Sequence, residues 1–201
     1  MNNKLFTFLA PLLGYIDNGR FFREPFRWLY VIFAVLNLLF PIAILVKVID
    51  TGFFKFAEGK AIFAFILIFI ILCGGAWASY LLWMNRKNKL KEVIQEDNEF
   101  IAIPVVSHLT QTVGEWLGLY IGVVGTLCSL IIAILAANEL QYVMPVSTGI
   151  FFLMPIYGFL IVVFARLLAE LYRALAVIAN NTKKLTKTEA KTEAKLEDIE
   201  D

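Results

Sequence analysis

Three polar residues with chemistry to offer follow Pro104 and precede a long apolar stretch. His108, Gln111 and Glu115 are spaced at i, i+3 and i+7, which places them on one face of a helix. An imidazole and a carboxylate on one face are titratable groups that can pass on protons or bind a cation. We therefore predict a polar vestibule at these residues, and the alternative is a helix turn facing water or headgroups. The chain has 1 histidine, which excludes a multi-histidine metal site in one chain.

A second charged group lies where another apolar stretch ends. Arg166 and Glu170 are spaced at i, i+4, and Glu170 and Arg173 at i, i+3. Such spacing predicts a ladder of ion pairs along one helix, although arginine before glutamate is the weaker orientation. The predicted role is to anchor the helix end at a membrane boundary, with the arginines reaching lipid phosphates. A binding role is the alternative.

The segment around these charges also carries a family resemblance. Residues 164–180 show an aromatic-x-Arg-x-x-x-Glu-Leu pattern, followed by an aliphatic run and an asparagine. This resembles the closing signature of a bacterial domain-of-unknown-function family of small multi-pass membrane proteins. The resemblance implies a bacterial membrane protein and supplies no catalytic residue.

Glycines recur every four residues just after the polar group. Gly114, Gly118 and Gly122 form two overlapping GxxxG motifs, and helices that lack side chains on one face can approach closely. One interpretation is an interface between subunits. The other is packing inside the same chain, most simply against the last apolar stretch.

Four stretches without charge must position these residues: 28–46, 61–84, 116–137 and 144–165. Each is close to the roughly 20 residues that a helix needs to cross a bilayer. In lipid the backbone must satisfy its own hydrogen bonds, so the stretches are predicted to be helices. With 60% hydrophobic residues and a mean hydropathy of +0.75, the chain is too apolar for an ordinary soluble domain. The predicted fold is an all-α polytopic membrane protein with four transmembrane helices.

Basic residues predict the orientation. Fifteen of the 18 lysines and arginines fall before the first stretch, between the second and third, or after the fourth. The other three are Lys47, Lys55 and Lys60. The positive-inside rule therefore places both termini in the cytoplasm.

The two ends of the chain are predicted to lie outside the four-helix transmembrane domain of residues 28–180. Residues 1–27 are predicted to form an interfacial segment with an amphipathic helix. Asn180 and Asn181 are predicted to end the last helix. The charged tail 181–201 is left as either a single helix or disordered, because it has too few apolar residues for a core.

Signals for catalysis are missing. The chain has no HExxH, GxSxG, P-loop or Rossmann glycine pattern, and its net charge of +1 does not favour nucleic acid. Cys73 and Cys128 fall inside apolar stretches and are interpreted as packing residues. Asn37 with Pro41 is predicted to kink a span rather than form a transport site, since no repeat matches it. We expect no enzyme activity, cofactor or metal.

These patterns lead to an expected function. A strong packing motif without chemistry inside the membrane indicates a non-enzymatic scaffold or accessory subunit of the bacterial cytoplasmic membrane. Its expected partners are the lipid bilayer and either a second copy or another membrane protein. The alternative is an oligomeric ion channel or small-solute transporter, lined by Gln111, Thr112, Glu115 and Thr126.

Overall fold

The chain is built from helices and short turns. The computed structural model describes residues 10, 11, 14, 20–95, 102–135 and 151–200, and no strand occurs in that part. This confirms the all-α prediction. The elements are α2 (Arg20–Asp50), α3 (Phe53–Phe56), α4 (Gly59–Gln95), α5 (Ala102–Gly118), the π-helical η1 (Leu119–Gly125), α6 (Thr126–Leu135) and α7 (Met154–Glu200).

Three stretches of these helices are long and apolar enough to cross a membrane. They are Pro25–Asp50, Gly59–Leu90 and Ala102–Leu135, and they contain the first three predicted spans almost completely. Between 22% and 39% of the residues in the most apolar part of each are buried within the chain. The remaining apolar side chains point outward, as lipid permits and water does not. Of the fourth predicted span, residues 144–150 lie outside the described part.

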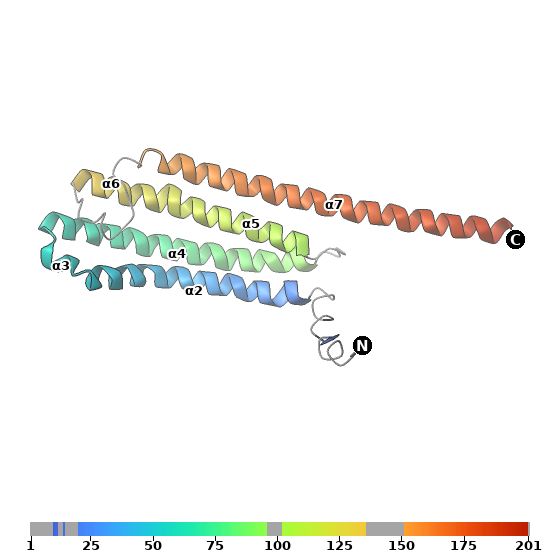
Figure 1. The fold of residues 1–201 in the computed structure, drawn as a ribbon, viewed down its shortest axis with the longest axis horizontal. Coiled ribbons are helices and arrows are strands. Elements are labelled where there is room, and N and C mark those ends of the chain that lie inside the picture. The colour runs from blue at the N-terminus through green and yellow to red at the C-terminus, as the bar shows by residue number, and fades with distance from the viewer. Residues whose placement is uncertain (1–9, 12–13, 15–19, 96–101, 136–150, 201) are drawn as a thin grey trace, which may run out of the picture.

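The helices lie side by side along a common direction (Figure 1). Helix α4 packs against α2, α5 and α6, whereas α7 packs against α5 and η1 and so forms one edge. The beginning of α2, the end of α4 and the beginning of α5 lie at one end of the bundle, and α7 continues past that end (Figure 1). We call it the extension end. Helices α3 and α6 lie at the opposite end.

Two apolar clusters hold the bundle together, one toward each end. Near α3, the fully buried Phe53 packs with Ile68 and Ile132. Gly52 allows this insertion, because its φ of 69° is a left-handed conformation that glycine adopts without strain. Near the extension end, Tyr30, Trp83 and other buried residues form an aromatic cluster. Large rings fill the space between α2, α4 and α5 there.

The helix that begins with α5 changes its winding partway. Residues Leu119–Gly125 form a π-helix between α5 and α6, where α7 packs closely. Such segments are rare in helices and are frequent at functional sites. No sequence pattern considered above predicted this change.

Helix α7 is longer than predicted. It runs without a break over 47 residues, which corresponds to about 70 Å at 1.5 Å per residue. The prediction that Asn180 and Asn181 end it is wrong. The helix continues through both asparagines, and helix-forming lysines follow them. Of the two alternatives for the tail, the structure has the single helix.

The predicted N-terminal segment is described in part. Residues 5–16, where an interfacial helix is predicted, lie outside the described part except for Ala10, Pro11 and Gly14. Helix α2 already begins at Arg20, inside the segment assigned to the interface.

Candidate functional site

Gly114, Gly118 and Gly122 face α7 of the same chain, and we call this line of glycines the glycine seam. Gly114 lies against Ala165, and both Gly118 and Gly122 lie against Gly158, so the two helices run antiparallel. A Cβ atom added to Gly122 would lie 3.2 Å from the Cα of Gly158, and one added to Gly118 would lie 2.8 Å from its carbonyl oxygen. The two backbones therefore touch at Gly122 and Gly158, whereas Gly114 and Gly118 also lie against the side chains of Ala165 and Val162. This is the intramolecular alternative, and a subunit interface has no access to the seam while α7 is docked.

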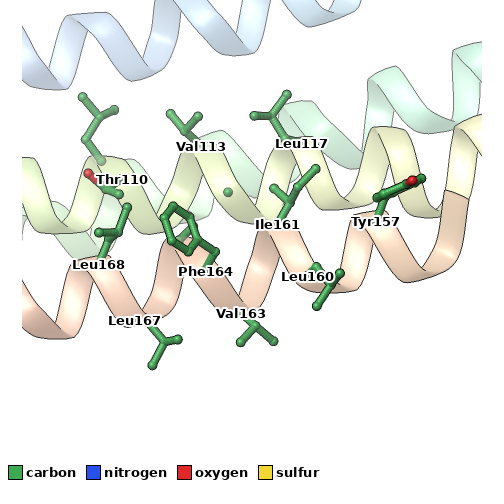
Figure 2. Close-up of a pocket in the computed structure, with 13 residues that line it drawn as sticks. Thr110, Val113, Leu117, Tyr157, Leu160, Ile161, Val163, Phe164, Leu167 and Leu168 are labelled. Carbon is green, nitrogen blue, oxygen red and sulfur yellow. The ribbon is translucent and has the colours of Figure 1, made fainter. Parts of the chain in front are cut away.

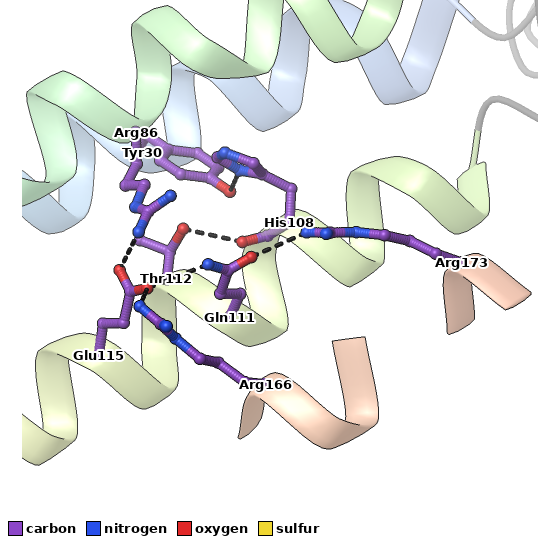
Figure 3. A network of polar contacts seen from close by, with 8 residues as sticks. All are labelled: Tyr30, Arg86, His108, Gln111, Thr112, Glu115, Arg166 and Arg173. Carbon is purple, nitrogen blue, oxygen red and sulfur yellow. Dashed lines mark hydrogen bonds and ion pairs between the residues drawn. The ribbon is translucent and has the colours of Figure 1, made fainter. Parts of the chain in front are cut away.

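One carboxylate beside the seam joins three helices. Glu115 of α5 pairs with Arg86 of α4 through Oε2. Its Oε1 accepts from Nη2 of Arg166 in α7 at 3.1 Å and from Nε2 of Gln111 at 3.0 Å (Figure 3). The Glu115 side chain is 11% exposed, so solvent screens these pairs less than pairs on an open surface. We call Arg86, Glu115 and Arg166 the clamp.

A second contact fixes α7 about two turns further along. Arg173 donates through Nη2 to Oε1 of Gln111 at 2.8 Å and through Nε to Oγ of Ser107 at 3.2 Å. The Ser107 hydroxyl in turn donates to the carbonyl of Ala169 at 2.7 Å. Because Ser107 is buried, its bond to Ala169 lies inside the α5–α7 interface, whereas the Arg173–Gln111 bond lies at the exposed rim.

The ion-pair ladder predicted along α7 does not form. In the described residues, no ion pair joins Arg166 or Arg173 to Glu170, whose side chain is exposed. The face of α7 that carries both arginines packs on α5, which offers a carboxylate and an amide. Glu170 lies near the arginines along α7 but further from the buried line of Ala165 and Ala169, and its side chain is exposed. Both arginines therefore contact α5, and the anchoring of the helix end at a membrane boundary stays a prediction.

The predicted vestibule is divided between two environments. Gln111 and Glu115 meet the arginines, whereas the buried His108 turns toward α2, with Nδ1 2.7 Å from the hydroxyl of Tyr30 (Figure 3). The buried Thr112 donates to the carbonyl of His108 at 2.8 Å. In the described structure, no hydrogen bond joins His108 to Glu115, so the predicted proton relay has no direct path.

A polar contact that the sequence did not indicate links α2 to α5. Trp116 donates through Nε1 to Oδ1 of Asn37 at 2.7 Å, and Nδ2 of Asn37 donates to the carbonyl of Phe33 at 2.7 Å. Asn37 is 5% exposed within an apolar helix. Its side-chain oxygen and nitrogen each have a hydrogen-bond partner, as a buried amide requires. The feature of the sequence that could have indicated this bond is Asn37 itself, a single amide within an apolar span. Polar side chains in membrane helices often form hydrogen bonds to a neighbouring helix.

Replacing Asn37 by leucine is expected to lower the free energy of unfolding by about 1–2 kcal/mol, since the Trp116 donor would lose its partner. Denaturant titration in detergent, followed by circular dichroism, measures the change. The matched control is Asn88→Leu, which alters an exposed amide near the end of α4. Equal stability of the two variants would contradict a structural role for the Asn37–Trp116 bond.

The site offers few groups for a cofactor or metal. Over the described ranges, no three histidine, cysteine, aspartate or glutamate side chains converge as ligands. Cys73 is exposed, Cys128 is buried, and both are free thiols. Both carboxylate oxygens of Glu115 are bonded to groups from the same or neighbouring helices, so the arrangement holds helices together.

The fold and the clamp define this chain as an all-helical protein with three helices able to cross a membrane. Comparisons with models of protein families, with curated proteins and with solved structures gave no match. The resemblance of residues 164–180 to a bacterial membrane-protein family therefore stays a prediction.

Proposed function

We propose that this chain is a non-enzymatic scaffold or accessory subunit that holds α7 in a fixed direction for a partner outside the bilayer. The supporting observation is the continuity of α7. It is one helix from Met154, inside the bundle, to Glu200, well beyond it (Figure 1). All side chains from Asn181 to Glu189 are exposed and leave this part of the helix open to a partner.

The docked part of α7 accounts for the stability of the extension. An isolated helix of this length is marginal in water, because forming its first turn is unfavourable. An extension that continues a packed helix needs no new nucleus. The glycine seam sets the distance between α7 and α5, while Arg166 and Arg173 set the rotation of α7. Together they fix the direction in which the extension leaves the bundle.

The membrane topology proposed here has four spans and places the extension end in the cytoplasm. The apolar first third of α7, with the residues that precede it, provides the fourth span. Lys87 and Lys89 lie at the extension end and Lys183 and Lys184 lie in the extension, whereas Lys47, Lys55 and Lys60 lie toward α3. This separation of charge fits the positive-inside rule. The resemblance noted above supports a bacterial cytoplasmic membrane.

Single cysteines test this topology in a variant that lacks Cys73 and Cys128. A membrane-impermeant maleimide is expected to label Lys55→Cys in intact cells. Asn88→Cys and Lys184→Cys are expected to react only after the membrane is opened. Labelling of Lys55→Cys and Lys184→Cys from the same side would contradict the four-span topology.

Photo-crosslinking in native membranes tests the scaffold function. A photoreactive residue at Leu185, which is 64% exposed on the extension, is expected to capture one protein reproducibly. The same probe at Ile70, 61% exposed on α4, serves as the lipid-facing control. Gly158→Leu, which would displace α7, is expected to abolish the Leu185 product. If no position from 181 to 189 gives a protein product, the scaffold proposal is wrong.

The channel alternative receives less support from the geometry. Thr112 and Thr126 donate to carbonyls of their own helix, and Glu115 is paired with two arginines. Gln111 bonds both Glu115 and Arg173, so all four side chains expected to line a pore are engaged within one chain. The scaffold is the function that this arrangement supports best.

A further inference from the structure

A groove of about 510 Å³ runs beside the glycine seam and ends at the clamp. It arises because α7 packs on α5 and η1, and the glycines at the contact contribute no side chains. Its walls are apolar and come from three helices, and Glu115 is the charged residue that lines it. The principal wall residues are Leu82 from α4, Leu119 and Val123 from η1, and Phe159 and Val162 from α7.

The charged side chains beside this end of the groove carry excess positive charge, and the described lining includes Glu115 but no arginine. Arg86 and Arg166 both bind Glu115, and Arg173 lies about two turns further along α7, so three guanidinium groups lie near one paired carboxylate. The Arg166 side chain is 57% exposed, and its one hydrogen bond among the described residues is to Glu115. A guanidinium has five N–H donors in a planar fork that suits phosphate. Arg166 therefore has donors free to bind an anion.

The clamp lies at the depth expected for lipid phosphates. Glu115 is 20 residues from Leu135, the end of α6, which corresponds to about 30 Å of helix. The hydrocarbon core of a bilayer is about 30 Å thick. In the topology proposed above, with Leu135, the last described residue of α6, placed at one face of the core, Glu115 and Arg166 lie near the other, beside the headgroups.

We propose that the groove binds an anionic phospholipid, with the lipid phosphate on Arg166 and one acyl chain along Leu119 and Phe159. The proposal rests on the membrane location proposed above. A basic pocket between helices next to an apolar surface is suited to such a lipid. A soluble phosphate would use the arginine and leave the groove unfilled.

A second groove, of about 820 Å³, lies on the other flank of the α5–α7 contact (Figure 2). Its lining is apolar apart from Thr110 and Tyr157, and no charged side chain lines it. We expect it to accept acyl chains without preference for a headgroup. It therefore provides an internal comparison for the charged groove.

Native mass spectrometry of the purified chain, with phosphatidylglycerol and phosphatidylcholine in equal amounts, tests the proposal. The wild type is expected to retain phosphatidylglycerol about fivefold over phosphatidylcholine, the ratio expected for one arginine beside anionic lipid. Arg166→Gln is expected to abolish the preference. Inorganic phosphate is expected not to displace the lipid, because it cannot occupy the groove.

Glu115→Gln separates lipid binding from stability. Both this variant and Arg166→Gln lose the Arg166–Glu115 ion pair, so general loosening of the bundle would affect both alike. Removing the carboxylate leaves Arg86 and Arg166 free for phosphate, and the preference for phosphatidylglycerol is expected to rise above that of the wild type. Equal retention of both lipids by the wild type, displacement by inorganic phosphate, or a preference that falls in Glu115→Gln would overturn the proposal. These readouts use the purified chain, so they are independent of the crosslinking test for a protein partner.

Discussion

Replacing Gly158 by alanine is expected to force α7 away from α5 and to lower the free energy of unfolding by about 2–3 kcal/mol. The added Cβ would collide with the Cα of Gly122 and would lie 2.7 Å from its nitrogen and 2.8 Å from the carbonyl oxygen of Gly118. These are backbone atoms, which cannot rotate away as a side chain can. The helices must separate, and every contact along the seam then weakens. Denaturant titration in detergent micelles measures the loss.

The matched control for this substitution is Gly74→Ala in α4. A Cβ at Gly74 would meet no atom within 4 Å, so the alanine is expected to be neutral or to stabilise the helix slightly. Similar stability of Gly158→Ala and Gly74→Ala would show that α7 is not packed closely on η1.

Replacing Glu115 by glutamine is expected to be the most damaging change of a charged side chain. Arg86, with 20% of its side chain exposed, would lose its carboxylate, as would Arg166. A partly buried charge without its partner destabilises a protein by about 1–3 kcal/mol. The loss of stability of Glu115→Gln in nanodiscs, measured by thermal unfolding, is expected to fall in this range.

Two further variants test this explanation. Glu170→Gln removes an exposed carboxylate that makes no ion pair with Arg166 or Arg173, and it is expected to leave stability unchanged. The double variant Arg86→Gln with Glu115→Gln removes both charges. Its loss of stability is expected to be smaller than the sum of the losses of the two single variants. If the two losses add, Arg86 and Glu115 are not coupled.

Much of the fold followed from local features of the sequence. Stretches without charge have to form helices in lipid, so the first three spans could be placed from composition alone. A glycine every four residues likewise indicates a helix face that another backbone approaches. The partner was left open, because the spacing of Gly118 and Gly122 is the same whether the facing helix belongs to this chain or another.

The clamp was harder to predict because it depends on competition between local and distant partners. The i, i+4 spacing along α7 indicated Glu170 as the partner of Arg166, and arginine before glutamate is the weaker order for such a pair. Docking on α5 offers the less exposed Glu115 instead. Which carboxylate is used depends on the face of α7 that packs, and the sequence of α7 alone does not fix that face.

The π-helix η1 and the Asn37–Trp116 bond have the same origin. Both lie at contacts between helices that are far apart in the sequence: η1 against α7, and α2 against α5. The asparagines at 180 and 181 show the opposite error, since a local signal for a helix end was overridden by continued helical bonding.

Pulsed electron paramagnetic resonance between spin labels at positions 88 and 184, in nanodiscs, tests most directly whether the bundle fixes the direction of α7. Position 88 lies near the end of α4, and position 184 lies on the extension. A rigid α7 predicts one narrow distribution of distances, which broadens in Gly158→Ala and stays unchanged in Gly74→Ala. A broad distribution in the wild type, as wide as in Gly158→Ala, would contradict the proposal that this chain holds α7 in place for a partner.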